Sequence, residues 1–148
     1  MKTWSDEYTA AGASPRVLDI GTGTGNLAGS FAEREAVVTG VDISSGMLSQ
    51  ARKRYGSKIT FIQADALSLG GLCDNSFDIV TAGFVLHEMP SDYRVKVLLE
   101  MKRLANRFVV VVDYIPNWNP VVAAVEKIEG SYYHQFLNEI TGQLRKLS

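Results

Sequence analysis

The chain has 148 residues, 46% hydrophobic and 21% charged, which fits one folded domain, residues 1–148, with a substantial core. Its formal net charge of −1 gives no overall field that would attract nucleic acid or an anionic membrane surface. A single cysteine, no apolar signal core at the start and no apolar run near the roughly 20 residues of a membrane span together predict a cytoplasmic protein without disulfides.

Short apolar runs alternate with helical patterns along the chain. Strands are expected at Arg16–Ile20, Val37–Val41, Ile59–Gln63, Phe77–Ala82 and Arg107–Tyr114. Helices are expected at Asn26–Glu35, from Ser44 or Ser45 to Gly56, from Ser91 or Asp92 to Leu104, and at Val121–Gly130 and Tyr132–Ile140. This alternation predicts an α/β fold with a mostly parallel sheet and helices on both of its faces.

The stretch VLDIGTGTGN, from Val17 to Asn26, joins the first strand to the first helix and contains Gly21, Gly23 and Gly25. Glycine adopts positive φ at little cost and lets a ligand approach the backbone closely. The N–H groups that open the following helix attract the negative end of a ligand. The stretch therefore predicts a ligand-binding turn.

Three aspartates fall at the ends of predicted strands around this turn. Asp42 closes the second strand, where a carboxylate can accept hydrogen bonds from both hydroxyls of a ribose. Asp65 follows the third strand, where it can accept a hydrogen bond from an adenine amine. Asp19 lies just before Gly21, where it would repel a pyrophosphate but help to hold a cationic amino group. These positions indicate a ligand with ribose, adenine and an ammonium group.

Four ordered segments, VLDIGTGTGN, VTGVDIS, IQADAL and FDIVTAGFVLHEMP, resemble the successive motifs of class I S-adenosylmethionine-dependent methyltransferases. The likeness covers about Val17–Pro116. It implies a Rossmann-like three-layer sandwich whose sheet has about five strands in the order 3-2-1-4-5. It also implies S-adenosylmethionine as the cofactor and S-adenosylhomocysteine as the product. The segment from Asp113 to Leu147 is similar to small-molecule methyltransferases, including those of the quinone-biosynthesis type.

The resemblance implies which residues contact each part of the cofactor. The residues expected around the methionine part, together with Asp19, are Gly21, Thr22, Gly23, Gly25, Ala82, Gly83 and Phe84. The residues expected around the ribose and adenine are Asp42, Ile43, Met47, Asp65 and Ala66. The sequence shows no metal-ligand spacing, so no metal is expected.

The reaction expected from the resemblance is in-line transfer of a methyl group to a small-molecule acceptor, with the protein orienting the two partners. His87, just past the fourth strand, is the candidate base, and packing near the substrate mouth is the alternative. Trp118, Tyr132, Tyr133 and Phe136 either line a substrate pocket or pack the last helices. Two other functions stay open: a non-catalytic module that binds the cofactor or its product, and an NAD-dependent oxidoreductase.

The family's sheet usually has two further strands, but no strand is expected here after Tyr114. The fifth strand would then be an edge, and its Val109–Val112 run, apolar on both faces, suits a strand between two helical layers. An apolar edge pairs readily with another chain. We therefore expect the C-terminal helices or a second copy in a two-fold dimer to cover it.

Overall fold

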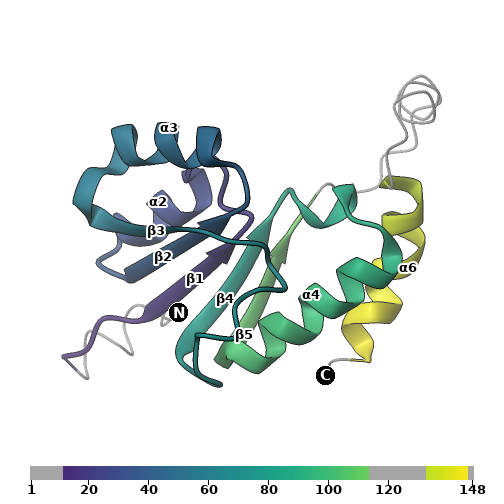
Figure 1. The fold of residues 1–148 in the computed structure, drawn as a ribbon. Helices are drawn as coiled ribbons and strands as arrows, with labels where there is room; N and C mark the ends of the chain where they lie inside the picture. Colours follow the sequence, from purple (N-terminus) through teal and green to yellow (C-terminus); the bar gives the residue numbers. More distant parts are fainter. Residues whose placement is uncertain (1–11, 114–132, 147–148) are drawn as a thin grey trace.

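Figure 1 shows a computed structural model of the chain, in which residues 12–113 and 133–146 are described, without the side chains of residues 133–137. The predicted helix Val121–Gly130 and the side chains of Trp118, Tyr132, Tyr133 and Phe136 lie outside these residues. Most of the stretch in which no further strand is expected also lies outside them.

The centre of the fold is a parallel sheet of five strands in the order β3-β2-β1-β4-β5. The strands are β1 (Arg16–Ile20), β2 (Val37–Asp42), β3 (Ile59–Gln63), β4 (Phe77–Gly83) and β5 (Ala105–Val112). The predicted order and the predicted Rossmann-like fold are confirmed. The bounds of the first four strands agree with the prediction to within one residue, whereas β5 starts and ends two residues earlier than expected.

The helices follow the strands in alternation. They are α2 (Asn26–Ala32), α3 (Ser45–Tyr55), α4 (Ser91–Leu104) and α6 (Tyr133–Arg145), with short 3₁₀ turns η1 (Gly56–Lys58) and η2 (Leu86–Glu88). The hydroxyl oxygen of Ser44 accepts the N–H of Met47 at 3.3 Å and caps α3. The prediction that the first helix continues to Glu35 was wrong, because α2 ends at Ala32 and the turn that follows it reaches a left-handed φ of 62° at Glu35.

Side chains of each central strand alternate between two apolar cores, one on each face of the sheet. In β1, Val17 packs into a core with Ala28 of α2, whereas Leu18 packs into a core with Met101 of α4. Figure 1 shows the same division, with α2 and α3 over one part of the sheet and α4 and α6 beside the other. The molecule therefore has three layers, and its sheet is buried on both faces at the centre.

β5 is less covered than the sequence predicts. Phe108 and Val110 are 50% and 37% exposed, so the expected burial of this strand on both faces is wrong in part. Within the described residues β5 pairs only with β4 and is the last strand of the sheet. Phe108 and Val110 therefore remain accessible on one face of β5, whereas Val109 and Val111 pack against the core of the α4 face.

The parallel arrangement brings the carboxyl ends of all five strands to one edge of the sheet. Ligands of such sheets bind outside this edge, next to the strand at which the order reverses. That strand is β1, which carries the glycine turn. None of the helices in residues 12–113 and 133–146 has the length and apolarity needed to cross a membrane.

Candidate cofactor cleft

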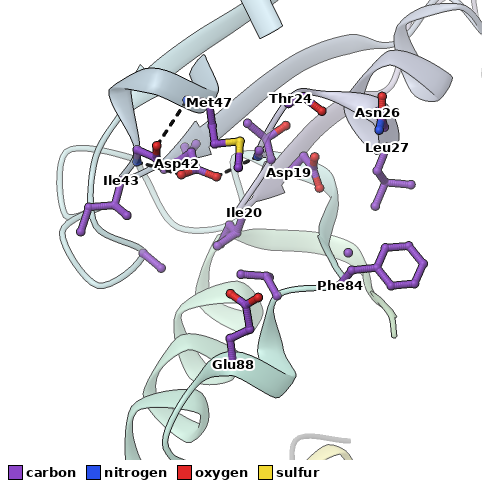
Figure 2. Close-up of a pocket in the computed structure, with 18 of the residues that line it drawn as sticks. Asp19, Ile20, Thr24, Asn26, Leu27, Asp42, Ile43, Met47, Phe84 and Glu88 are labelled. Atoms are coloured by element: carbon purple, nitrogen blue, oxygen red, sulfur yellow. Dashed lines mark hydrogen bonds between the residues drawn. The ribbon is translucent and has the colours of Figure 1, made fainter. Parts of the chain in front are cut away.

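A cleft of about 810 Å³ opens at the carboxyl ends of β1, β2 and β4 (Figure 2). The predicted cofactor residues that line it are Asp19, Gly21, Thr22, Gly23, Asp42, Ile43, Met47, Asp65, Ala66, Gly83 and Phe84. In Figure 2, Asp42, Ile43 and Met47 gather at one end of the cleft, and Leu27 and Phe84 lie at the other. The fold thus brings together residues from four separate sequence segments.

The glycine turn forms the floor of the cleft between β1 and α2. Gly21, Gly23 and Gly25 adopt positive φ values of 68°, 55° and 83°. The turn is tied to β2, because the N–H of Thr22 donates to the carbonyl of Val41 at 2.9 Å. Glycine adopts positive φ at a lower energetic cost than any other residue type, which explains the three glycines.

Asp42 is held in place by the backbone on two sides. Its Oδ2 accepts the N–H of Gly23 at 2.8 Å, and its Oδ1 accepts the N–H of Ser44 at 2.8 Å. Each carboxylate oxygen has two lone pairs, so both oxygens keep acceptor capacity for a ligand. The carboxylate is therefore both fixed to the glycine turn and able to accept further hydrogen bonds in the cleft.

Asp19 lies deeper, with only 1% of its surface exposed. It faces its register neighbour Thr81 on β4, whose hydroxyl donates to Oδ1 of Asp19 at 2.7 Å. Burial raises the pKa of Asp19, and the hydrogen bond from Thr81 opposes that rise. Asp19 thus lies beneath the glycine turn and lines the cleft from below.

Asp65 stands across the cleft from the glycine turn and contacts α4. Its Oδ1 accepts both the N–H of Leu67 and the hydroxyl of Tyr93, each at 2.7 Å. The hydrogen bond from Leu67, followed by that from Tyr93, lowers the pKa of Asp65. Burial, followed by the bond to Asp65, raises the pKa of Tyr93 to about 12. Asp65 is therefore a carboxylate and Tyr93 a neutral donor near neutral pH.

Large apolar side chains surround the cleft although they are poorly buried. Ile43, Met47 and Phe84 are 68%, 45% and 51% exposed. Phe84 also adopts a φ of 56°, a conformation that costs an aromatic residue energy and that clusters at functional sites. Apolar surface gathered in a concave site favours a ligand with apolar or aromatic parts.

The charges at the cleft all have one sign. Four acidic side chains line it, those of Asp19, Asp42, Asp65 and Glu88. Among the residues that the structure describes, no lysine, arginine or histidine does so. Such a lining favours a cationic ligand over a diphosphate, because like charges in a partly buried site repel strongly.

Arg94 anchors the wall of the cleft formed by η2 and α4. Its side chain is fully buried, and Nη1 donates to the carbonyls of Leu86 and Met89 at 3.4 and 3.1 Å. Its Nη2 donates to Glu139 at 3.0 Å and its Nε to Gln143 at 2.9 Å, both on α6. One guanidinium thus joins η2, α4 and α6.

Three predicted site residues do not line the cleft. Ala82 is fully buried in the apolar core of the α4 face. Gly25 caps α2, and a Cβ there would lie 3.0 Å from the ring of Tyr55. His87 is 14% exposed, and its Nδ1 lies 2.8 Å from Oδ1 of Asp113. Contacts between these three residues and a cofactor or acceptor stay predictions.

Sequence reasoning missed several residues of the lining. These residues are Ile20, Thr24, Asn26, Leu27, Ser30, Val41, Ser44, Ala64, Val85, Glu88, Met89 and Tyr93. Most are sequence neighbours of predicted positions, so a wider window around each strand end would have included them. Tyr93 had no such signal, because its contact with Asp65 spans 28 residues. No group of three potential metal ligands occurs in residues 12–113 and 133–146.

A family model described as a methyltransferase domain matches residues 17–107. A demethylmenaquinone methyltransferase from Beutenbergia cavernae is 33% identical over 134 residues, which cover 88% of this chain and 53% of the relative. The chain belongs to the class I S-adenosylmethionine-dependent methyltransferases. A ubiquinone/menaquinone biosynthesis C-methyltransferase from Bdellovibrio bacteriovorus is 40% identical over 103 residues, 66% of this chain and 43% of that protein.

Solved structures share the fold. The magnesium protoporphyrin IX methyltransferase of Synechocystis, solved with bound S-adenosylmethionine, has a TM-score of 0.60 and 28% identity over 72% of this chain and 53% of its own. The YcgJ protein of Bacillus subtilis has a TM-score of 0.61 and 30% identity over 74% of this chain and 48% of its own. This methyltransferase chain spans about half or less of the length of the curated relatives it matches.

The residues at the cleft fit the cofactor of this family, which is S-adenosylmethionine. The fixed carboxylate of Asp42 offers acceptors for ribose hydroxyls, and the exposed Ile43 and Met47 offer apolar faces for a purine. The acidic lining suits the positive charges of the sulfonium and the amino group. A Cβ on Gly23 would meet nothing within 4 Å, so the turn leaves space there for a ligand to approach the backbone.

Proposed function

We propose that this chain binds S-adenosylmethionine in the cleft and transfers its methyl group to a small-molecule acceptor. The observation that carries the proposal is the carboxylate of Asp42, which the N–H groups of Gly23 and Ser44 hold at 2.8 Å beside the glycine turn. A nucleoside with two free ribose hydroxyls is the ligand that this arrangement suits best.

Each end of the cleft takes a different part of the cofactor in this proposal. Asp42 accepts hydrogen bonds from the ribose hydroxyls, and Ile43 and Met47 pack on the two sides of the adenine. Asp65 accepts from the amino group of the adenine, beside the backbone of Ala66. The glycine turn, Asp19, Gly83 and Phe84 surround the methionine part. Thr22 belongs to that turn and packs against Gly40. A Cβ added to Gly40 would lie 2.8 Å from Oγ1 of Thr22.

The bound cofactor supplies an activated methyl group on a sulfonium. The chain's own part is to hold the acceptor in line with the methyl–sulfur bond, because orientation alone lowers a barrier by on the order of 7–11 kcal/mol. The end of the cleft that this proposal leaves for the acceptor has an apolar lining, formed by Leu27, Phe84, Val85 and Met89. This lining, and relatives named demethylmenaquinone methyltransferase, favour an apolar, ring-containing acceptor.

His87 remains the candidate base on the acceptor side. It lies at the carboxyl end of β4, and its contact with Asp113 at 2.8 Å fixes the orientation of its ring. Because His87 does not line the cleft, this role requires the acceptor to extend beyond the cleft to the ring of His87, which then removes its proton. We expect His87→Gln to lower kcat strongly while the affinity for S-adenosylhomocysteine stays unchanged. An unchanged kcat would instead show that His87 and Asp113 contribute to packing and not to catalysis.

The proposed cofactor is tested by thermal shift with S-adenosylmethionine, S-adenosylhomocysteine, NAD and ATP. A ligand that binds only the folded state raises the melting temperature. We expect stabilisation by the first two ligands and none by the others. Stabilisation by NAD alone would overturn the proposal in favour of an oxidoreductase.

A second function deserves the same test, because the chain covers only 53% of the relative from Beutenbergia cavernae. A module of this length can hold a cofactor without a complete acceptor site. Binding of S-adenosylhomocysteine with no methyl transfer to quinols, phenols and other small acceptors would favour such a binding module.

The exposed edge of β5 bears on assembly. We infer that a second copy of the chain pairs with the edge of β5 in a two-fold dimer and so shields Phe108 and Val110, because apolar strand edges pair readily. Cover by the C-terminal part of the same chain is the alternative. Light scattering that shows a monomer, with fast amide exchange through Val109–Val112, would contradict both. The cytoplasmic location expected from the sequence stays a prediction.

A further inference from the structure

Tyr93 is the residue of α4 that reaches the adenine end of the cleft. It lines the cleft, and its hydroxyl donates to Oδ1 of Asp65 at 2.7 Å across a sequence separation of 28 residues. The N–H of Leu67 donates to the same oxygen at 2.7 Å. Both donors thus converge on one oxygen of Asp65, and Oδ2 is left for a further contact.

The position of Tyr93 is fixed by its own helix. The next residue, Arg94, is fully buried and donates to the carbonyls of Leu86 and Met89, which lock the first turn of α4 against η2. The ring of Tyr93 is half-buried and packs against the apolar core of that face. A phenol held in this way limits the rotation of the carboxylate that it contacts.

We propose that Tyr93 is a positioning residue that holds Asp65 so that its second oxygen faces the purine, and that this contact selects a 6-amino purine over a 6-oxo purine. The inference rests on the proposed cofactor site. A carboxylate is an acceptor only, so it pairs with the amino group of adenine and opposes the carbonyl oxygen of hypoxanthine. A fixed carboxylate discriminates better than a rotating one, because rotation allows it to turn away from the wrong base.

The test compares two ligands on variants of the full chain. Calorimetry measures the dissociation constants of S-adenosylhomocysteine and of its deaminated analogue, S-inosylhomocysteine. Tyr93→Phe removes only the hydroxyl. The matched control is Tyr55→Phe, because Tyr55 lies on α3, packs against Gly29 and does not line the cleft.

We expect the wild-type chain to prefer the adenosyl ligand strongly. Tyr93→Phe should weaken adenosyl binding about tenfold, because Asp65 must then lose its rotational freedom on binding, and should leave inosyl binding almost unchanged. The preference for the adenosyl ligand then falls about tenfold. Tyr55→Phe should leave that preference as in the wild type.

Three results overturn the inference. An unchanged preference in Tyr93→Phe would show that the hydroxyl does not position Asp65 for recognition. An equal loss for both ligands would assign Tyr93 a purely structural role. Failure of the wild-type chain to bind S-adenosylhomocysteine would overturn the proposed function and this inference together, which distinguishes the two failures.

A second variant checks the geometry at Asp65 itself. In Asp65→Asn the amide oxygen can still accept from Leu67 and Tyr93, and the amino group then faces the purine. We expect the preference to shift toward the inosyl ligand, because an amide N–H donates to a carbonyl oxygen. A strong adenosyl preference retained in Asp65→Asn would contradict the assigned orientation.

Discussion

The two walls of the cleft are held by contacts of different range. On the β1–β2 wall, Asp42 binds the backbone of Gly23 and Ser44, which are 19 and 2 residues away. On the α4 wall, Arg94 binds the nearby carbonyls of Leu86 and Met89, but Tyr93 and Arg94 also reach partners 28 to 49 residues away on other elements. The first wall is therefore largely specified by its own motifs, whereas the second depends on the packing of distant helices.

The largest effect is expected on the α4 wall, from Arg94→Met. This change removes the charged donor of the carbonyls of Leu86 and Met89 and one of the donors to Glu139, which Ser91 and Gln143 still contact. We expect the free energy of unfolding to fall by about 3 kcal/mol, because hydrogen bonds to a charged group contribute about 1.5–3 kcal/mol each. Chemical denaturation measures it.

Arg103→Met is the matched control for that prediction. Arg103 also donates to two acids, Glu100 and Asp74, and to backbone carbonyls, but its side chain is 29% exposed. We expect a loss of about 1 kcal/mol, since water compensates an exposed pair. Equal losses for the two arginines would show that burial does not distinguish them.

The next effect tests the β1–β2 wall. We expect Asp42→Ala to weaken S-adenosylhomocysteine binding about 100-fold, or about 2.7 kcal/mol, because it removes the ribose acceptor and loosens the glycine turn. Asp78→Ala is the control, since Oδ2 of Asp78 also accepts a backbone N–H, that of Arg16, at 2.8 Å, but lies outside the cleft. Calorimetry that finds Asp42→Ala within twofold of the wild type would refute the ribose contact.

These two walls also explain what the sequence could predict. The glycine turn, Asp42 and the Ser44 cap follow from the order and spacing of neighbouring residues, so their arrangement was predictable. The strand order was predictable from the resemblance to a family. The resulting expectations for the fold are confirmed, and the contacts between these residues and a cofactor stay predictions.

The contacts of Tyr93 and Arg94 were not predictable, because nothing local marks which residue of an amphipathic helix will face a distant carboxylate. The burial of Ala82 was not predictable for a related reason. β4 is buried on both faces, so its sequence lacks the polar alternation that would tell one face from the other. The predicted burial of β5 on both faces was wrong in part for the same reason. Val110 stands in an apolar run that is typical of a buried strand, but its side chain is 37% exposed.

A smaller effect separates two glycines of the turn. Both Gly21 and Gly23 have positive φ, so alanine at either costs about 1 kcal/mol in strain. A Cβ at Gly21 would also lie 2.8 Å from Val85, whereas a Cβ at Gly23 meets nothing within 4 Å. We expect Gly21→Ala to be less stable than Gly23→Ala by about 1 kcal/mol. Equal melting temperatures would show that Val85 moves aside freely.

The smallest effect is the acid dependence of stability at Asp65. Hydrogen bonds from Leu67 and Tyr93 lower its pKa below the ordinary 3.8, so the unfolded chain takes up this proton first as the pH falls. The contribution of Asp65 to stability is therefore present above pH 3.8 and is lost as the pH drops through its lower folded-state pKa.

Asp19 acts with the opposite sign, because burial raises its pKa and its folded form is protonated first. Asp65→Asn should thus flatten the fall of stability below pH 3.8. Asp19→Asn should remove a gain of stability that Asp19 provides as the pH falls from its raised folded-state pKa toward 3.8, and should therefore make stability fall more steeply above pH 3.8. Chemical denaturation at a series of acidic pH values measures how steeply the free energy of unfolding changes with pH in each variant and in the wild type. Slopes that change in the same direction in both variants would contradict the assignment, because the two carboxyl groups differ in burial and in the donors that reach them.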